Sequence, residues 1–196
     1  MKHLKEVAKF LVGFMPWILF LFISGNSLTS LERAIVICFV ASIVFGFREL
    51  RSGFILQWGT FFFFVACLLA VNVLKMTAVA ENMGLLANGF LASIIWLTVL
   101  AGKPFTLQYA RVELPKERWH EPELVKSCRF IAIVWGSLLT FSAGVSYFRV
   151  AEPGRYPAWC YACISIGTII GGTIFTQVYK SYRRAQSQRQ MERSQV

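Results

Sequence analysis

Long apolar stretches recur along this chain of 196 residues, and they constrain its fold more than any other feature. Charged residues make up only 15% of the sequence and lie mainly between these stretches, whereas soluble domains carry about 25%. A soluble globule of this size has too little interior for so much apolar surface, and a disordered chain would leave that surface in water. The sequence therefore predicts an all-α, polytopic transmembrane helical bundle.

Six stretches approach the roughly 20 apolar residues that a helix needs to cross a bilayer. These predicted spans cover residues 10–24, 28–47, 54–74, 83–101, 130–150 and 158–179. The first has no small-residue cleavage site after it, so we expect a retained span rather than a signal peptide. The second is the weakest, because only residues 34–47 are free of charge. We expect one transmembrane domain over residues 1–180 and a polar basic tail, 181–196, that is frayed or disordered.

The distribution of positive charge predicts the orientation of these spans. All Lys and Arg residues except Arg33, Lys75, Arg149 and Arg155 lie before the first span, after the second, after the fourth or after the last. Positive residues mark the cytoplasmic loops of membrane proteins, so both termini are predicted to be cytoplasmic. The net charge of +10 then reflects topology and anionic lipid headgroups rather than nucleic acid. The sequence has no Asn-x-Ser/Thr sequon, as expected in a bacterial inner membrane.

The cytoplasmic segment 102–129 is the only sizeable polar connection between spans. Within it, large apolar side chains alternate with polar ones, and cations lie among them. This pattern is typical of a segment that lies flat at the headgroup boundary, so residues 104–114 are predicted to bind the inner surface of the membrane. A docking surface for a cytoplasmic partner and a catalytic loop are the alternatives. The candidate lipid-interface residues are Lys103, Phe105, Leu107, Tyr109, Arg111 and Arg118.

Two segments of the chain are similar to each other. Residues 53–59 read GFILQWG after the second span, and residues 104–110 read PFTLQYA after the fourth. Trp58-Gly59-Thr60 is also similar to Trp135-Gly136-Ser137. The similarity predicts a parallel duplication, in which spans two and three correspond to spans four and five about an axis along the membrane normal. Chance similarity between apolar segments is the alternative.

Residues 102–111 read GKPFTLQYAR and are followed by Pro115, Trp119, Pro122 and Trp135-Gly136. This stretch resembles a group of uncharacterised bacterial inner-membrane proteins that are loosely akin to the intracellular septation protein A family. The likeness covers residues 96–146. That family typically has about five spans, with a Pro-Phe-Thr element after an apolar helix, whereas this chain has a longer loop and an additional C-terminal span. The resemblance implies a role in envelope upkeep or division and assigns no functional residue.

Polar side chains inside the predicted spans are candidates for function, because they are costly in lipid. The strongest are Asn72, Asn88 and Ser142. None is ionisable, which disfavours proton-coupled transport. Hydrogen bonding between helices is one interpretation. A continuous polar cavity that reaches all three would instead indicate a small-molecule transporter or an oligomeric channel.

Cys160 and Cys163 form a C-x-x-C pair at the outer end of the last span. One helical turn separates them, so both thiols share a helix face, and an oxidising outer compartment would permit a disulfide. A membrane thiol oxidoreductase would also need a second outward pair. Cys38, Cys67 and Cys128 do not supply one. Two packed small residues are the alternative interpretation of the pair.

Gly167 and Gly171 give the last span a face of small residues that permits close approach of another helix. The partner is either another span of the same chain or a second copy in a homo-oligomer.

No sequence motif indicates catalysis. His120, Glu121 and Glu123 lack H-E-x-x-H spacing, and no phosphate-binding or dinucleotide-binding glycine pattern is present. No catalytic, metal or cofactor residue is therefore predicted. We expect a non-enzymatic, envelope-associated or accessory protein. A transporter or oligomeric channel is the first alternative, and a thiol oxidoreductase that uses Cys160 and Cys163 is the second.

Overall fold

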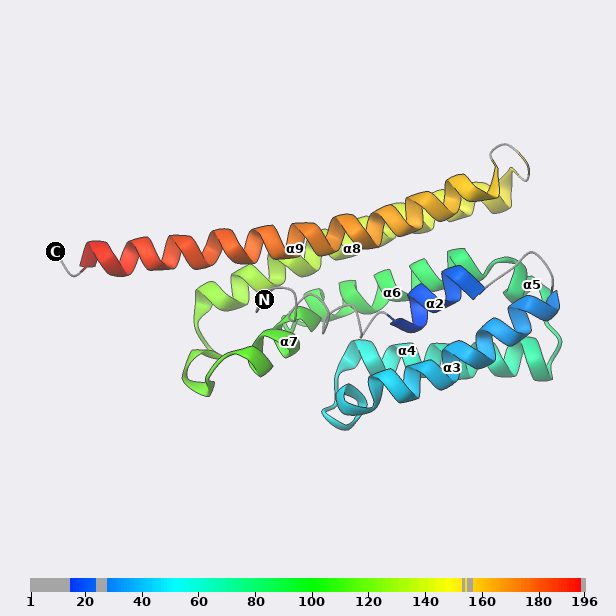
Figure 1. Cartoon of the computed structure of the whole chain (residues 1–196), viewed down its shortest axis with the longest axis horizontal. Coiled ribbons are helices and arrows are strands. Elements are labelled where there is room, and N and C mark those ends of the chain that lie inside the picture. Colours follow the sequence, from blue (N-terminus) through cyan, green and yellow to red (C-terminus); the bar gives the residue numbers. More distant parts are fainter. Residues whose placement is uncertain (1–14, 24–27, 153, 155–156, 195–196) are drawn as a thin grey trace.

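The computed structural model describes residues 15–23, 28–152, 154 and 157–194, and throughout these residues the regular structure is helical, with no strand (Figure 1). The elements follow one another along the chain, with η1 a π-helical continuation of α4 and η2 a short 3-10 helix. They are α2 (Met15–Ile23), α3 (Leu28–Arg51), α4 (Ile55–Cys67), η1 (Leu68–Val73), α5 (Thr77–Glu81), α6 (Met83–Leu100), α7 (Phe105–Glu113), η2 (Lys116–Arg118), α8 (Pro122–Ala151) and α9 (Ala158–Ser194).

Within the described residues, five helices are long and apolar enough to cross a membrane, so the chain is a multi-pass helical membrane protein. They comprise Thr29–Arg51, Ile55–Val73, Met83–Leu100, Pro122–Ala151 and Trp159–Arg183. The predicted span over residues 10–24 lies only partly within the described residues. Its described portion is α2, whose nine residues extend about 13 Å. The sixth span therefore stays a prediction.

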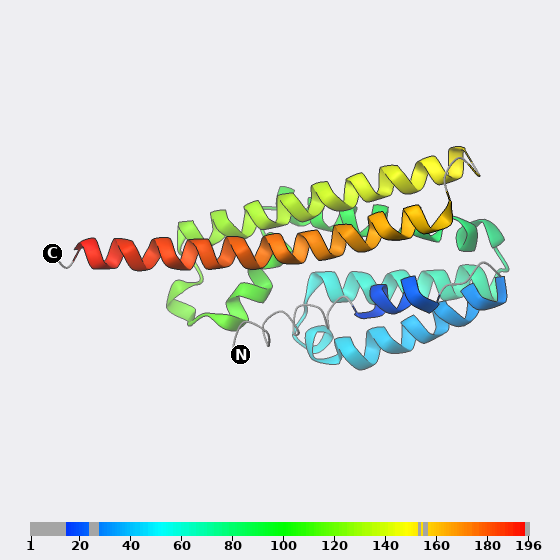
Figure 2. The same cartoon turned by 45° about the horizontal axis from the view of Figure 1, so that its top comes forward.

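The helices form two groups. In one, α3 packs against α2 and α4; in the other, α8 packs against α6, α7 and α9, and a contact between α4 and α6 joins the groups. Figure 2 shows α8 and α9 side by side, with the C-terminal part of α9 continuing past the bundle. We call the end where α3 and α6 finish and where α4, α7 and α8 begin the basic end.

Glycine and proline define the turns at the basic end. Gly53 follows α3 with φ +73° and Gly102 follows α6 with φ +70°, a left-handed conformation that glycine adopts without steric cost. An extended residue then precedes each next helix, Phe54 before α4 and Pro104 before α7. Pro122 occupies the first turn of α8, where its missing N–H leaves no helical hydrogen bond unmade.

Three tryptophans each link two helices through the same arrangement of two hydrogen bonds. Each indole N–H donates to a threonine hydroxyl on another helix at 3.0–3.1 Å: Trp17 to Thr60, Trp96 to Thr140, and Trp135 to Thr176. Each hydroxyl in turn donates to the carbonyl four residues earlier on its own helix, at Leu56, Gly136 and Gly172. These indole–threonine links join α2 to α4, α6 to α8, and α8 to α9.

Two of the links depend on a glycine beneath the tryptophan ring. A Cβ at Gly172 would lie 2.9 Å from the Trp135 ring, and a Cβ at Gly136 would lie 3.0 Å from the Trp96 ring. Any larger residue would push the indole away from its threonine. The packing prediction for Gly167 and Gly171 within the chain is therefore wrong: a Cβ at either position meets nothing within 4 Å, and Gly172 makes the close contact instead.

Two boundaries differ from those predicted. The tail was expected to be frayed or disordered, yet α9 is helical through Ser194, because a helix already fixed by packing is extended at little further cost. The segment 102–129, expected to be a loop, contains α7, η2 and the first turns of α8.

The two similar segments occupy related but unequal places. Each lies at a left-handed glycine, which is Gly53 at the start of the first segment and Gly102 two residues before the second. Residues 53–59 lead into a membrane-spanning helix, whereas residues 104–110 form most of the nine-residue α7. Trp58 is 41% exposed and Trp135 is fully buried, so these two tryptophans have different surroundings. The duplication stays a prediction.

Replacing Gly172 by Leu is expected to lower the free energy of unfolding by about 1–3 kcal/mol, because the side chain would overpack against Trp135. Gly171→Leu is the matched control, since it makes the same gain in helix propensity in open space. Thermal unfolding of both variants in one detergent provides the comparison. Equal midpoints would contradict the packing of Trp135 on Gly172.

Candidate functional site

At the basic end, α7 folds back against the beginning of α8. Phe105 is fully buried and Leu107 is 5% exposed. The Thr106 hydroxyl donates to the Cys128 carbonyl at 2.7 Å, and the Phe105 N–H donates to the Thr98 hydroxyl at 3.2 Å. α7 is therefore held by α6 and α8 through both hydrogen bonds and apolar packing.

This packing corrects the predicted lipid interface. Phe105 and Leu107 were expected to insert among lipid headgroups, but they are buried by protein. The alternation of apolar and polar residues suggested a segment that lies flat at the headgroup boundary, whereas the segment is a helix that packs against α8. Val112, in the last turn of α7, is 67% exposed.

Tyr109 joins the two turns at the basic end. Its ring meets the Phe54 ring edge-on, with centroids 4.8 Å apart, and also contacts the Phe105 ring. Burial raises the pKa of the Tyr109 phenol, and the nearby Glu49 carboxylate adds to the shift. The phenol consequently stays protonated throughout the physiological range and acts as a packing group.

Gln108 is a structural residue that the sequence analysis missed. Its Oε1 accepts a hydrogen bond from the Ile55 N–H at 3.0 Å, and its Nε2 donates to the Gly53 carbonyl at 3.4 Å. The first N–H groups of α4 have no partner within the helix, and Phe54 offers no capping side chain. Gln108 therefore caps α4 from α7. The corresponding Gln57 instead turns inward and donates to the Ser42 carbonyl.

Two of the predicted lipid-binding arginines are engaged within the protein. The Arg111 guanidinium lies 5.5 Å from the centre of the Trp119 ring. Arg118 donates from Nε and Nη2 to the two carboxylate oxygens of Glu121, at 2.8 and 3.0 Å. This hydrogen bonding lowers the pKa of the Glu121 carboxyl and raises that of Arg118.

Glu123 ties α8 to the part of α9 that continues past the bundle. Arg183 donates to its carboxylate, and Arg183 Nε also donates to the Ser127 hydroxyl at 3.1 Å. Lys126 lies 3.4 Å from the other carboxylate oxygen. These hydrogen bonds lower the pKa of the Glu123 carboxyl. Such exposed pairs add little stability but fix the direction of α9.

Five exposed cations at the basic end have no acidic partner among the described residues. They come from the last turn of α3, the turn after α6, η2 and α8. They are Arg48, Arg51, Lys103, Lys116 and Arg129. Lys103 is the only predicted lipid-interface residue among them. This set of unpaired cations, which we call the basic ring, is the strongest candidate binding surface in the described structure.

The three polar residues predicted inside the membrane are not gathered into one site. Asn88 Nδ2 donates to the Gly84 carbonyl at 2.9 Å and lies 3.5 Å from the Ser146 hydroxyl. The Ser142 and Ser165 hydroxyls are 3.5 Å apart. Asn72 lies in η1, which packs against α3 and α5 rather than with those helices. Asn88 and Ser142 therefore serve contacts between helices.

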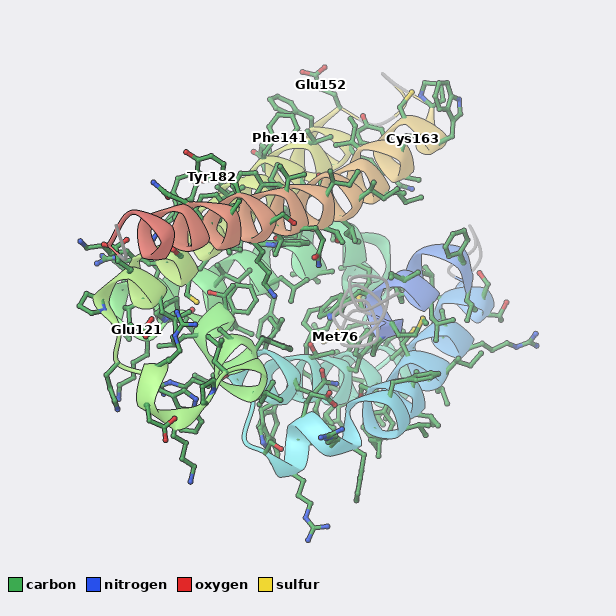
Figure 3. All side chains as sticks on the ribbon, turned by 60° about the vertical axis from the view of Figure 1, so that its left-hand side comes forward. Met76, Glu121, Phe141, Glu152, Cys163 and Tyr182 are labelled. Carbon is green, nitrogen blue, oxygen red and sulfur yellow. The ribbon has the colours of Figure 1, made fainter. Side chains whose placement is uncertain are left out.

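Cys160 and Cys163 lie at the beginning of α9, and both are free thiols. Cys160 is partly buried and Cys163 is exposed. Figure 3 places Cys163 at the opposite end of the bundle from Glu121. Cys38, Cys67 and Cys128 are buried free thiols on α3, α4 and α8. The redox hypothesis stays a prediction.

A comparison of the chain with protein-family models, curated proteins and solved structures found no match. The functional conclusion therefore rests on the chain itself.

The packing of α7 can be tested with single cysteines at positions 107 and 112 in a background without the five native cysteines. We expect a water-soluble maleimide to react with position 112 at least about tenfold faster, because position 107 reacts only after local opening. Reaction in denaturing detergent, where both rates should be equal, is the control. Rapid reaction at both positions in the folded protein would show that α7 does not pack against α8.

Proposed function

We propose that the chain is a non-enzymatic accessory protein of a bacterial inner membrane that holds anionic lipid headgroups at its basic end. The observation that carries this proposal is the basic ring, in which Arg48, Arg51, Lys103, Lys116 and Arg129 are exposed without an acidic partner in the described structure. Each cation near an anionic membrane surface contributes about 1 kcal/mol to binding. Five of them, held by a rigid bundle, form a selective surface for anionic headgroups.

In this proposal the basic end faces the cytoplasm, and α2, with the residues before it, completes a sixth span, so that both termini are cytoplasmic. The contrast between the two ends supports this orientation. At the opposite end, Lys75 pairs with Glu32 at 3.0 Å, and the Arg149 guanidinium lies 5.8 Å from the centre of the Tyr161 ring. Unpaired positive charge is thus concentrated at the end that the positive-inside rule places in the cytoplasm.

The accessory role is favoured over transport by the way the polar groups inside the membrane are used. Asn88 donates to Ser146 on α8, and the Ser142 hydroxyl lies within hydrogen-bond distance of Ser165 on α9. The indole–threonine links place three further hydroxyls between helices. Such bonds stabilise helix packing. A transport pathway would need these groups turned toward a common cavity.

Reporter fusions test the proposed orientation. Fluorescent protein fused to either terminus should be bright, and alkaline phosphatase fused to either terminus should be inactive, because positive segments stay in the cytoplasm. Alkaline phosphatase inserted at Gly154, between α8 and α9, should be active and serves as the control. Activity of the N-terminal phosphatase fusion alone would show that the chain has no sixth span. Activity of the C-terminal fusion would show that the basic end faces away from the cytoplasm.

Two double variants that lower the net charge equally test the basic ring. Arg51→Gln with Lys116→Gln removes two unpaired cations, and Arg118→Gln with Lys126→Gln removes two that already pair with Glu121 and Glu123. The first should lose about fivefold per cation in phosphatidylglycerol retained by the purified protein, measured by native mass spectrometry from equimolar phosphatidylglycerol and phosphatidylcholine. The second should lose much less. Equal losses would mean that only net charge matters and would overturn the proposal.

A further inference from the structure

A groove of about 460 Å³ runs between α6 and α8. Its lining includes Gly89, Ser93, Trp96 and Leu100 on α6, with Thr140 and Ala143 on α8. Gly89 and Leu100 are separated by three helical turns, so they lie on the same face of α6, about 16 Å apart. That length matches one leaflet of the hydrocarbon core, which is half of about 30 Å. The groove therefore extends from the basic end to the middle of the membrane.

The polar groups that line this groove are already bonded within the protein. The Ser93 hydroxyl donates to the Gly89 carbonyl and the Thr140 hydroxyl to the Gly136 carbonyl, each at 2.8 Å. The Trp96 indole N–H donates to Thr140. No lining hydroxyl or indole N–H needs a further partner, so an apolar chain can occupy the groove without leaving a donor unsatisfied.

Two members of the basic ring lie beyond the lining of the groove, toward the basic end. Arg129 precedes Thr140 by three turns of α8, which places it on the same helix face as the groove. Lys103 follows Leu100 by three residues, directly after α6 ends. Both side chains are exposed and form no ion pair with the described residues. The groove is thus apolar along its length and positively charged at its mouth.

We propose that this groove binds one acyl chain of an anionic phospholipid, whose phosphate lies between Lys103 and Arg129. The proposal rests on the proposed function, in which the basic end holds anionic lipid, and it assigns one lipid to a defined site. The charge at the mouth complements a phosphate, and it would repel a second copy of a chain that carries a net charge of +10.

The test uses the full chain in nanodiscs of phosphatidylcholine that contain a small fraction of phosphatidylglycerol with a photoreactive acyl chain. After illumination, crosslinked peptides are mapped by mass spectrometry. Crosslinks should concentrate in residues 89–100 and 140–143, above the level at Val40 and Val44, which are exposed apolar residues on α3. Crosslinks spread evenly over all exposed apolar positions would overturn the proposal, and this measurement needs no variant.

Gly89→Leu fills the groove, and Gly171→Leu adds the same side chain outside it; neither added Cβ meets an atom within 4 Å. Gly89→Leu should reduce groove crosslinks to the level at Val40, while Gly171→Leu should leave them unchanged. An equal effect of both variants would overturn the site. Crosslinks from the groove to a second protein chain, or a change of oligomeric mass in Gly89→Leu alone, would identify a second copy as the occupant instead.

Lys103→Gln with Arg129→Gln tests the mouth of the groove. The preference of the groove for phosphatidylglycerol over a phosphatidylcholine probe should fall by about fivefold per cation, while the phosphatidylcholine probe still labels the groove. An unchanged preference would show that Lys103 and Arg129 do not bind the lipid phosphate. If groove crosslinks are not concentrated in the unmodified chain while the Arg51 and Lys116 variant still loses phosphatidylglycerol, only this inference is refuted. Equal losses in the two double variants described above refute the proposed function.

Discussion

A polar group inside a bilayer has no water to bond with, and the indole–threonine links are the way this chain meets that constraint. Each link lets one threonine hydroxyl accept from a tryptophan on a neighbouring helix and donate to its own backbone. An interhelical bond of this kind contributes only about 0.6–2 kcal/mol. Its loss costs more, because an unpaired indole N–H would remain buried. The links therefore specify which helices meet and at what register, beyond their modest contribution to stability.

The register set by these links determines what happens at the basic end. Because Trp96 on α6 bonds Thr140 on α8, α6 ends beside the middle of α8. The first turns of α8 continue past Leu100 toward the basic end, and the connection between the two helices turns there. α7 fills that turn, and Gln108 extends the connection to the beginning of α4. The acidic side chains Glu121 and Glu123 neutralise the cations nearest to them. The basic ring consists of the exposed cations at this end that form no ion pair with the described residues.

The membrane class and the approximate positions of five spans could be predicted from the sequence, because hydropathy and length determine whether a helix crosses a bilayer. Contacts between side chains could not. The alternation of Phe105, Leu107 and Tyr109 suggested a lipid surface, because nothing in the sequence shows that α8 is available to cover α7. Gly167 and Gly171 matched a known packing pattern, but the glycine that packs against a neighbouring helix is Gly172, which lies four residues before Thr176. That spacing has meaning only once a tryptophan on the facing helix is placed.

The same interaction connects the fold to lipid binding. Thr140 belongs both to the link that holds α6 to α8 and to the lining of the groove between them. If Thr140 carried no hydroxyl, the Trp96 N–H would face the groove unpaired, and the groove would attract water or a polar ligand in place of an apolar chain. Because the hydroxyl satisfies the indole, the groove beside this contact exposes no unpaired indole N–H. Helix association and the apolar character of the groove thus depend on one hydrogen-bonded pair, and the cations proposed to select a headgroup, Lys103 and Arg129, lie outside it.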